Sequence, residues 1–278
     1  MTKFLPTLLS LSFLIVALPA GAAPAAENDQ PWEKLQKDGT EDIDTGRYGD
    51  AERVLRLAVI KGGNFGEKDL RFAKSLGELG RLYTIRGRFA EAEPLLEEEL
   101  YVKEQAMNAE TGEIIPSMGS LVSFYLEHGT ASKAEPLAEK LLGFVTGKMD
   151  EAASGAKSNA KYQKGVPLTG WAGQASLTMR DPAIEWAITC DAIGNQFRLR
   201  NNLDMAEKLF KAALDVKETI LGKFHLSLAN SYDNLGTICM ERNQDAEAET
   251  FFRYALETTE RIEPPENPTV FSRLDKLA

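Results

Sequence analysis

Few residues of this chain have the types and spacing that catalysis or metal binding requires. The two histidines, His128 and His225, have no cysteine or carboxylate at a spacing typical of a metal site. The segment from Gly155 to Ser158 is a partial match to a phosphate-binding loop, but the earlier glycine and a preceding strand are missing. Because chemistry must be argued from a site, we expect no catalytic residue, no metal and no cofactor.

An Ala-Glu pair returns along the chain at a nearly fixed interval. Successive pairs are 41, 42, 72 and 42 residues apart, beginning at Ala51, Ala92, Ala134, Ala206 and Ala248. Gly80, Gly194 and Gly236 each lie twelve residues before one of these alanines. Self-similarity at such a period predicts stacked two-helix repeats that form a solenoid.

The residues around these markers predict two helices per repeat, which we call helix A and helix B. In helix A, residues that suit a buried helix face recur at i, i+3, i+4 and i+7, as in Leu76, Leu79, Gly80 and Tyr83. A glycine inside a helix costs about 1 kcal/mol relative to alanine. We therefore expect helix A to approach helix B closely at the glycine.

Two longer stretches resemble the tetratricopeptide repeat family, in its 42-residue kinesin-light-chain type. The stretch Gly87 to Leu96 reads Gly-Arg-Phe-Ala-Glu-Ala-Glu-Pro-Leu-Leu, and Asn267 to Ala278 resembles the start of that family's helix A. The resemblance covers about residues 31–149 and 181–278. It implies an all-α, right-handed superhelical solenoid of helix-turn-helix repeats, with a final lone helix A that caps the stack.

The pattern departs from the family at three places. Val122 stands where glycine is expected, Ala131 replaces a large residue, and the first helix around 32–42 is weakly patterned. HEAT and armadillo repeats have similar periods, but they lack the twelve-residue step from glycine to alanine. We therefore prefer the tetratricopeptide interpretation.

In tetratricopeptide folds, helix A residues beside the buried stripe line a concave groove. By register, the resemblance implies that six residues line a peptide-binding groove in this chain: Lys74, Arg81, Asn195, Arg198, Asn230 and Asn234. Asparagine can donate and accept hydrogen bonds to a peptide backbone, and arginine can bind carboxylates. The alternative for each residue is an ordinary solvated helix face.

The first 22 residues read as a signal peptide. Lys3 precedes an apolar core from Leu5 to Leu18, and Ala20 to Ala22 offers a small-residue cleavage site. We expect a bacterial exported protein that is periplasmic or secreted, with no stable membrane insertion after cleavage. An uncleaved membrane anchor is the alternative.

The interval of 72 residues indicates an insertion. We divide the chain into a signal peptide at 1–22, N-terminal repeats at 23–149, a basic inserted loop or helix extension at 150–180, and C-terminal repeats with a capping helix at 181–278. Lys157, Lys161 and Lys164 make the insertion basic within an acidic protein. It is either a plain loop or helix extension, or a lid or docking element.

The two cysteines, Cys190 and Cys239, are expected to remain thiols. The repeat register offsets them by seven residues on equivalent helices, or about 10 Å of rise, and the sideways separation of packed helices adds about 8–10 Å. A disulfide tolerates only about 7 Å between Cα atoms.

The formal charge of −10 argues against nucleic acid as a partner. We expect a non-enzymatic scaffold or adaptor that binds a protein or peptide outside the cytoplasm. The alternatives are an accessory or regulatory subunit of an extracytoplasmic enzyme complex and, third, an enzyme that uses the insertion.

Overall fold

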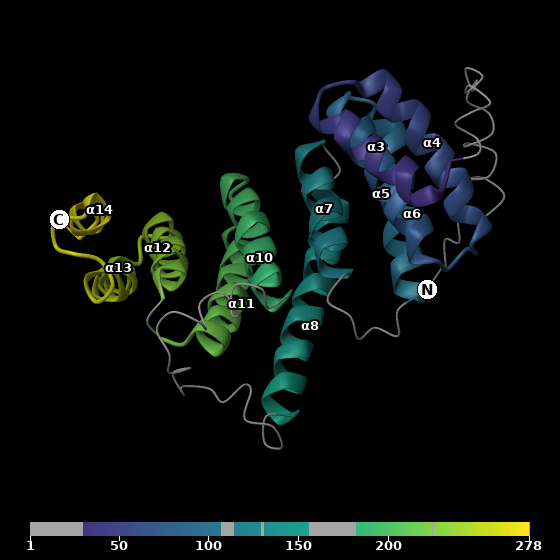
Figure 1. Cartoon of the computed structure of the whole chain (residues 1–278). Helices are drawn as coiled ribbons and strands as arrows, with labels where there is room; N and C mark the ends of the chain where they lie inside the picture. The colour runs from purple at the N-terminus through teal and green to yellow at the C-terminus, as the bar shows by residue number, and fades with distance from the viewer. Residues whose placement is uncertain (1–29, 107–113, 129–130, 156–181, 224, 278) are drawn as a thin grey trace. The chain divides into compact units, whose positions relative to one another are not determined.

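A computed structural model describes residues 30–106, 114–128, 131–155, 182–223 and 225–277. Every regular element in these ranges is a helix, which confirms the all-α fold class. The helices are α3 (Trp32–Asp44), α4 (Tyr48–Asn64), α5 (Leu70–Ile85), α6 (Phe89–Ala106), α7 (Ile114–Glu127), α8 (Ala131–Gly155), α10 (Pro182–Leu199), α11 (Leu203–Leu221), α12 (Leu226–Glu241), α13 (Asp245–Glu260) and α14 (Pro268–Asp275) (Figure 1).

The helices form two compact units, Met1–Ser117 and Met118–Ala278, which divide inside α7. In the first unit α3 packs on α4, α4 on α5 and α5 on α6. In the second unit α10 packs on α11, α11 on α12, α12 on α13 and α13 on α14, and α8 also contacts α11. Helices α3, α5, α7, α10, α12 and α14 are therefore helix A of successive repeats, and the helices between them are helix B.

The turn from helix A to helix B has the same backbone geometry in four repeats. Each turn holds one residue with positive φ, namely 76° at Gly46, 72° at Gly87, 59° at Asn201 and 58° at Asn243. Glycine and asparagine adopt this left-handed conformation most readily. The next amide then donates back to helix A, for example from Arg88 N to the Tyr83 carbonyl at 2.8 Å.

Close approach of helix A to helix B at the glycine is confirmed. A Cβ atom placed on Gly80 would lie 2.8 Å from Leu96, and one on Gly236 would lie 2.6 Å from Phe252. Gly194 has the same relation to Phe210, at 2.8 Å. The large residue four positions after each alanine thus rests directly on the glycine of its own repeat.

The first repeat follows the same rule, although its first helix is weakly patterned in sequence. Gly39 lies twelve residues before Ala51, and a Cβ on Gly39 would lie 2.5 Å from Leu55. The four-residue step from Ala51 to Leu55 matches the later repeats. The first repeat is therefore regular at its central contact.

In the third repeat the sizes of the residues are exchanged. Val122 takes the glycine position on α7, while Ala138 takes the position of the large residue on α8. Both side chains are fully buried. A larger residue on helix A together with a smaller one on helix B conserves volume, which packed cores tolerate best.

Both cysteines are free, as the register predicts. Cys190 is fully buried on α10, and Cys239 is partly exposed on α12. Burial raises the pKa of the Cys190 thiol to about 12, and the neighbouring Asp191 adds to the rise. Cys190 therefore behaves as a small apolar core residue.

Several sequence predictions fall on residues outside the described ranges. These include the signal peptide and most of the insertion with Lys157, Lys161 and Lys164. Residues 150–155 continue α8, and α10 begins at Pro182 as expected. The last helix A of the given sequence is α14, whose N-cap Asn267 accepts from the Thr269 amide at 3.0 Å.

We predict that Gly236→Val lowers the free energy of unfolding by about 1–3 kcal/mol, because the new methyl groups collide with Phe252. Adding Phe252→Ala should cost less than it does in the unchanged chain, since the pair then resembles Val122 and Ala138. Urea unfolding of the four proteins measures this coupling.

The matched control is Gly143→Ala in α8, where an added Cβ meets nothing within 4 Å. It should stabilise the chain by up to about 1 kcal/mol through helix propensity. A Gly236→Val protein as stable as the unchanged chain would contradict the packing account.

Candidate peptide-binding surface

The six residues expected in the groove all lie on A helices, in two sets. Lys74 and Arg81 are exposed on α5 in the first unit. The second unit holds the other four, which are exposed or half-buried: Asn195 and Arg198 on α10, and Asn230 and Asn234 on α12.

On α5, Arg81 is already paired with carboxylates of the chain. Its guanidinium donates to Asp44 on α3 at 3.2 Å and to Glu78 at 3.4 Å. Lys74 makes no hydrogen bond or ion pair with the residues that the structure describes. Lys74 is therefore the more available cation of the two.

In the second unit, internal contacts again occupy most of the set. Arg198 donates to Glu241 on α12 at 2.6 Å, and Asn230 accepts from Arg273 on α14 at 2.8 Å. Asn195 donates to the Asp191 carbonyl of its own helix at 3.1 Å. Within the described ranges, only the Asn234 amide among these four has no hydrogen-bond partner.

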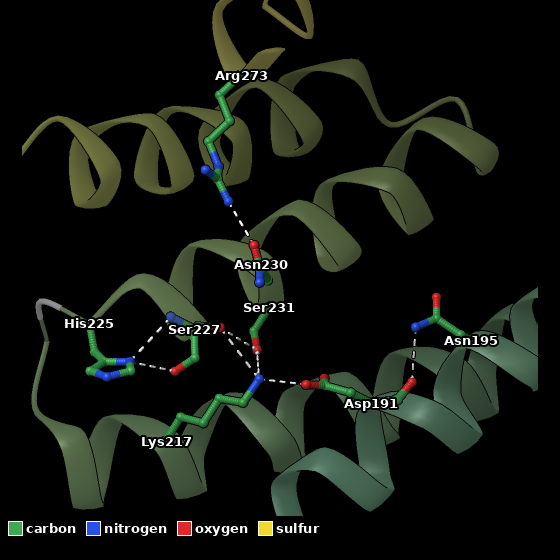
Figure 2. A network of polar contacts seen from close by, with 8 residues as sticks. All are labelled: Asp191, Asn195, Lys217, His225, Ser227, Asn230, Ser231 and Arg273. Carbon is green, nitrogen blue, oxygen red and sulfur yellow. Dashed lines mark hydrogen bonds and ion pairs between the residues drawn. The ribbon is translucent and has the colours of Figure 1, made fainter. Parts of the chain in front are cut away.

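A buried polar cluster centred on Lys217 lies beside these residues and joins three helices (Figure 2). Its ammonium group donates to the Asp191 carboxylate of α10 at 2.5 Å and to the Ser231 hydroxyl of α12 at 2.8 Å. The Ser227 carbonyl lies at 3.4 Å. Lys217 comes from α11, so the cluster connects helix A and helix B of one repeat to helix A of the next.

Burial raises the pKa of Asp191, while its ion pair and hydrogen bond with Lys217 act in the opposite direction. One oxygen, Oδ1, is buried without a hydrogen-bond partner in the described structure. Burying the charges of Lys217 and Asp191 costs desolvation free energy that offsets their attraction. The ion pair therefore serves to fix the positions of the helices more than to add net stability.

A similar cluster holds the second repeat to the start of α7. Lys103 donates to Glu99 at 2.7 Å and to Ser117 at 2.6 Å, and the Ser117 hydroxyl donates to Glu99 at 2.8 Å. Lys103 and Lys217 each lie eleven residues after the alanine of their own Ala-Glu pair. The lysine and the hydroxyl therefore repeat in register.

The carboxylate of the two clusters comes from different helices. In the second repeat it belongs to Glu99 of helix B, which lies within 2.6 Å of a Cβ placed on Gly77 of helix A. In the fourth repeat it belongs to Asp191 at the Gly77 position, and Ala213 stands at the Glu99 position. The exchange keeps one carboxylate beside each lysine.

In two repeats the glutamate of the Ala-Glu pair also binds the following repeat, a role that the sequence did not reveal. Glu52 accepts from the Tyr83 hydroxyl at 3.2 Å and from Arg88 at 2.8 Å, and it also pairs with Arg86. Glu207 pairs in the same way with Arg242, which follows α12. These contacts reach 31 to 36 residues along the chain.

Both histidines contact nearby residues of the chain. His225 is the N-cap of α12, where its Nδ1 accepts from the Ser227 amide at 3.2 Å. Burial and the nearby Lys217 lower the pKa of His225. The His128 ring lies 5.0 Å from that of Phe124. No group of three or more metal-ligating side chains occurs among the described residues.

The outer face of α10 carries exposed apolar residues that the sequence analysis missed. Ile188 is 57% exposed and Leu199 is 74% exposed. Ala192 and Asn195 lie between them at i+4 and i+7 from Ile188, on the same face of the helix. We call Ile188, Ala192, Asn195 and Leu199 the α10 stripe.

Comparisons with known protein families and with solved structures agree on one class of repeat. The tetratricopeptide repeat family matches residues 187–261 and residues 72–110. A Podosopora anserina crystal structure, named for kinesin-light-chain nearly identical TPR-like repeats, is 15% identical, with a TM-score of 0.57 over 85% of this chain and 99% of that one. An assembly chaperone of RpL4 (Acl4) is 17% identical, with a TM-score of 0.55 over 89% and 85%. No curated protein sequence is similar enough to count as a match.

The chain is thus an all-α repeat solenoid. Residues 72–110 and 187–261 match tetratricopeptide repeats, and the fold of the chain is like that of the solved kinesin-light-chain TPR-like repeats. Repeats of this kind support a role as a protein-binding scaffold.

We predict that Asp191→Gly lowers the free energy of unfolding by about 3 kcal/mol, because Lys217 remains buried without its carboxylate. Adding Ala213→Glu should recover much of the loss, since it recreates the arrangement of Gly77 and Glu99. Chemical unfolding measures both.

The exposed pair of Glu249 and Arg253 provides the control: Glu249→Gln should change stability by under about 0.5 kcal/mol. If Ala213→Glu further destabilises the Asp191→Gly protein, the two clusters are not equivalent.

A second prediction concerns the loss of folding stability at acidic pH. Burial alone would raise the pKa of Glu52, but the hydrogen bonds and charges of Arg88, with Tyr83 and Arg86, lower it below its ordinary 4.5. Folding therefore favours ionised Glu52, and this stabilisation is present above pH 4.5 and disappears as the pH falls through the lowered pKa.

Glu52→Gln should reduce the stability at neutral pH and should flatten the loss of stability between about pH 5 and about pH 3. Thermal unfolding across that range tests it. An unchanged slope in the variant would show that Glu52 is not linked to folding.

Proposed function

We propose that the chain is a non-enzymatic scaffold that binds a protein or peptide through its helix A surfaces. The α10 stripe is the observation that carries this proposal, because it places two large apolar side chains in solvent on a helix A. The neighbouring α12 adds the half-buried Asn234, whose amide has no partner among the described residues. On α5, the exposed Lys74 offers a cation.

The chemistry of the α10 and α12 surface in the second unit suits an extended segment or a helix with apolar side chains. Ile188 and Leu199 can bury a ligand's apolar groups at about 25 cal/mol per Å². Asn195 and Asn234 can donate to and accept from a peptide backbone. Arg81, Arg198 and Asn230 serve mainly to hold neighbouring A helices, since each is bonded to the next repeat or to the preceding one.

We further propose that the chain acts outside the cytoplasm. This rests on the signal-like pattern of residues 1–22, which lie outside the described structure. None of the described helices has both the length and the hydropathy of a membrane-spanning segment. N-terminal sequencing of the purified product tests the proposal: a start near Ala23 supports it, and an intact Met1 contradicts it.

The binding proposal is tested by affinity purification of the mature chain from its source, followed by titration of the recovered partner. The double variant Leu199→Asp/Asn234→Ala should weaken binding about tenfold or more. Its stability should change by under about 0.5 kcal/mol, because neither side chain is buried in the core.

The matched control is Ile60→Asp, which changes an exposed apolar residue on helix B of the first repeat. It should leave binding unchanged. Equal affinity of the double variant and the unchanged chain would rule out the α10 and α12 surface.

A further inference from the structure

The α10 stripe continues by one further step toward the start of its helix, to an exposed glutamate. With that residue, its members follow one another at steps of three, four, three and four residues: Glu185, Ile188, Ala192, Asn195 and Leu199. We call these five residues the α10 seam. Their steps average 3.5 residues, which is the spacing along which two helices pack as a coiled coil. The buried residues of α10, such as Cys190 and Phe197, lie on the opposite side of the helix.

The spacing of the α10 seam suits a helical ligand better than an extended one. Successive seam positions are about 5 Å apart along the helix axis, whereas same-face residues of a strand recur about every 6.7 Å. Ile188 and Leu199 are eleven residues, or about 16 Å, apart. An extended segment that crosses α10 would contact only one of them, while a helix laid along α10 contacts both. The small side chain of Ala192 lies between them and allows the second helix to come close.

Asn195 gives the α10 seam one polar position. Its amide nitrogen donates to the Asp191 carbonyl at 3.1 Å (Figure 2), while its Oδ1 atom accepts no hydrogen bond within the described ranges. A polar residue inside an otherwise apolar seam fixes the register of two packed helices. A partner helix therefore needs a hydrogen-bond donor, such as Gln or Asn, opposite Asn195.

The charges on and beside the α10 seam favour a basic partner. Glu185 is exposed and makes no ion pair with any residue that the structure describes. The two arginines near the other end of α10 are already bound. Arg198 pairs with Glu241 at 2.6 Å, and Arg200 donates to the Leu126 carbonyl at 2.6 Å. A Lys or Arg of a partner can therefore pair with Glu185 without displacing an internal contact.

From the heptad spacing, the polar position and the unpaired Glu185, we infer that the α10 seam binds an amphipathic helix of another protein, packed lengthwise along α10. This inference rests on the proposed function and specifies its partner. The partner helix carries apolar residues at heptad spacing, one polar donor opposite Asn195, and Lys or Arg near Glu185. A second copy of this chain is a poorer occupant, because it brings another unpaired Glu185 and arginines on α10 that are already bonded.

The test uses the purified full chain and labelled synthetic peptides, with fluorescence anisotropy as the measurement. The heptad peptide consists of three heptads with Leu at positions a and d, one central Gln in place of a Leu, and Lys at e and g. One control peptide has the same composition in an order without the heptad period, and another carries Glu instead of Lys. The heptad peptide should bind saturably and gain helicity in circular dichroism, and both control peptides should bind at least tenfold more weakly.

Variants of the chain locate the bound peptide. Leu199→Asp should weaken binding of the heptad peptide at least tenfold, and Glu185→Gln should reduce its advantage over the Glu peptide. The matched controls Ile60→Asp and Glu249→Gln change exposed residues of B helices and should leave binding unchanged. All four variants should keep the helicity of the unchanged chain, since each altered side chain is exposed.

Absence of saturable binding by the heptad peptide, or binding that Leu199→Asp does not weaken, would overturn the inference. Equal binding of either control peptide would also overturn it, and if Leu199→Asp weakens that binding, the proposed function survives. The proposed function fails separately, if the double variant Leu199→Asp/Asn234→Ala binds the recovered partner as tightly as the unchanged chain does. Sedimentation velocity should show a monomer. A dimer that Leu199→Asp dissociates would make a second copy the occupant and contradict the inference.

Discussion

The structure depends on one contact, repeated in most of its repeats: a large apolar side chain of helix B resting on a glycine of helix A. Leu96, Phe210 and Phe252 each lie where a Cβ on the facing glycine would collide. This contact brings the two helices together and sets the geometry of each repeat. The third repeat keeps the same volume by placing Val122 on helix A and Ala138 on helix B, so the constraint is on the summed size of the pair.

Contacts between repeats then determine where successive A helices stand. The clusters around Lys103 and Lys217 place a lysine of helix B beside a hydroxyl of the next helix A. Two glutamates of the Ala-Glu pairs, Glu52 and Glu207, bind arginines of the following repeat. Buried polar contacts of this kind are directional. They leave the outer face of each helix A free to differ, and in α10 that face is apolar.

The sequence predicted the repeats, the helices and the step from glycine to alanine because these features are encoded by residue types at fixed short spacings. It missed the regular first repeat, since Gly39 lies in a helix with a weak apolar pattern. It missed the lysine clusters and the arginine partners of Glu52 and Glu207, because each joins residues of different repeats. It assigned Arg198 and Asn230 to ligand binding, and the structure shows them bonded to Glu241 and Arg273. The α10 stripe cannot be predicted from the sequence, because an apolar residue on a helix can belong either to the core or to an exposed face.

The central claim is that a partner binds the helix A face of the second unit. Site-specific photo-crosslinking tests it most directly, with a photoreactive amino acid at Asn234 on α12 or, for comparison, at Lys208 on helix B α11. In extracts of the source organism, the account predicts a crosslinked adduct of one discrete mass from position 234 and none from position 208. An adduct from position 208 alone would place the partner on helix B and contradict the account.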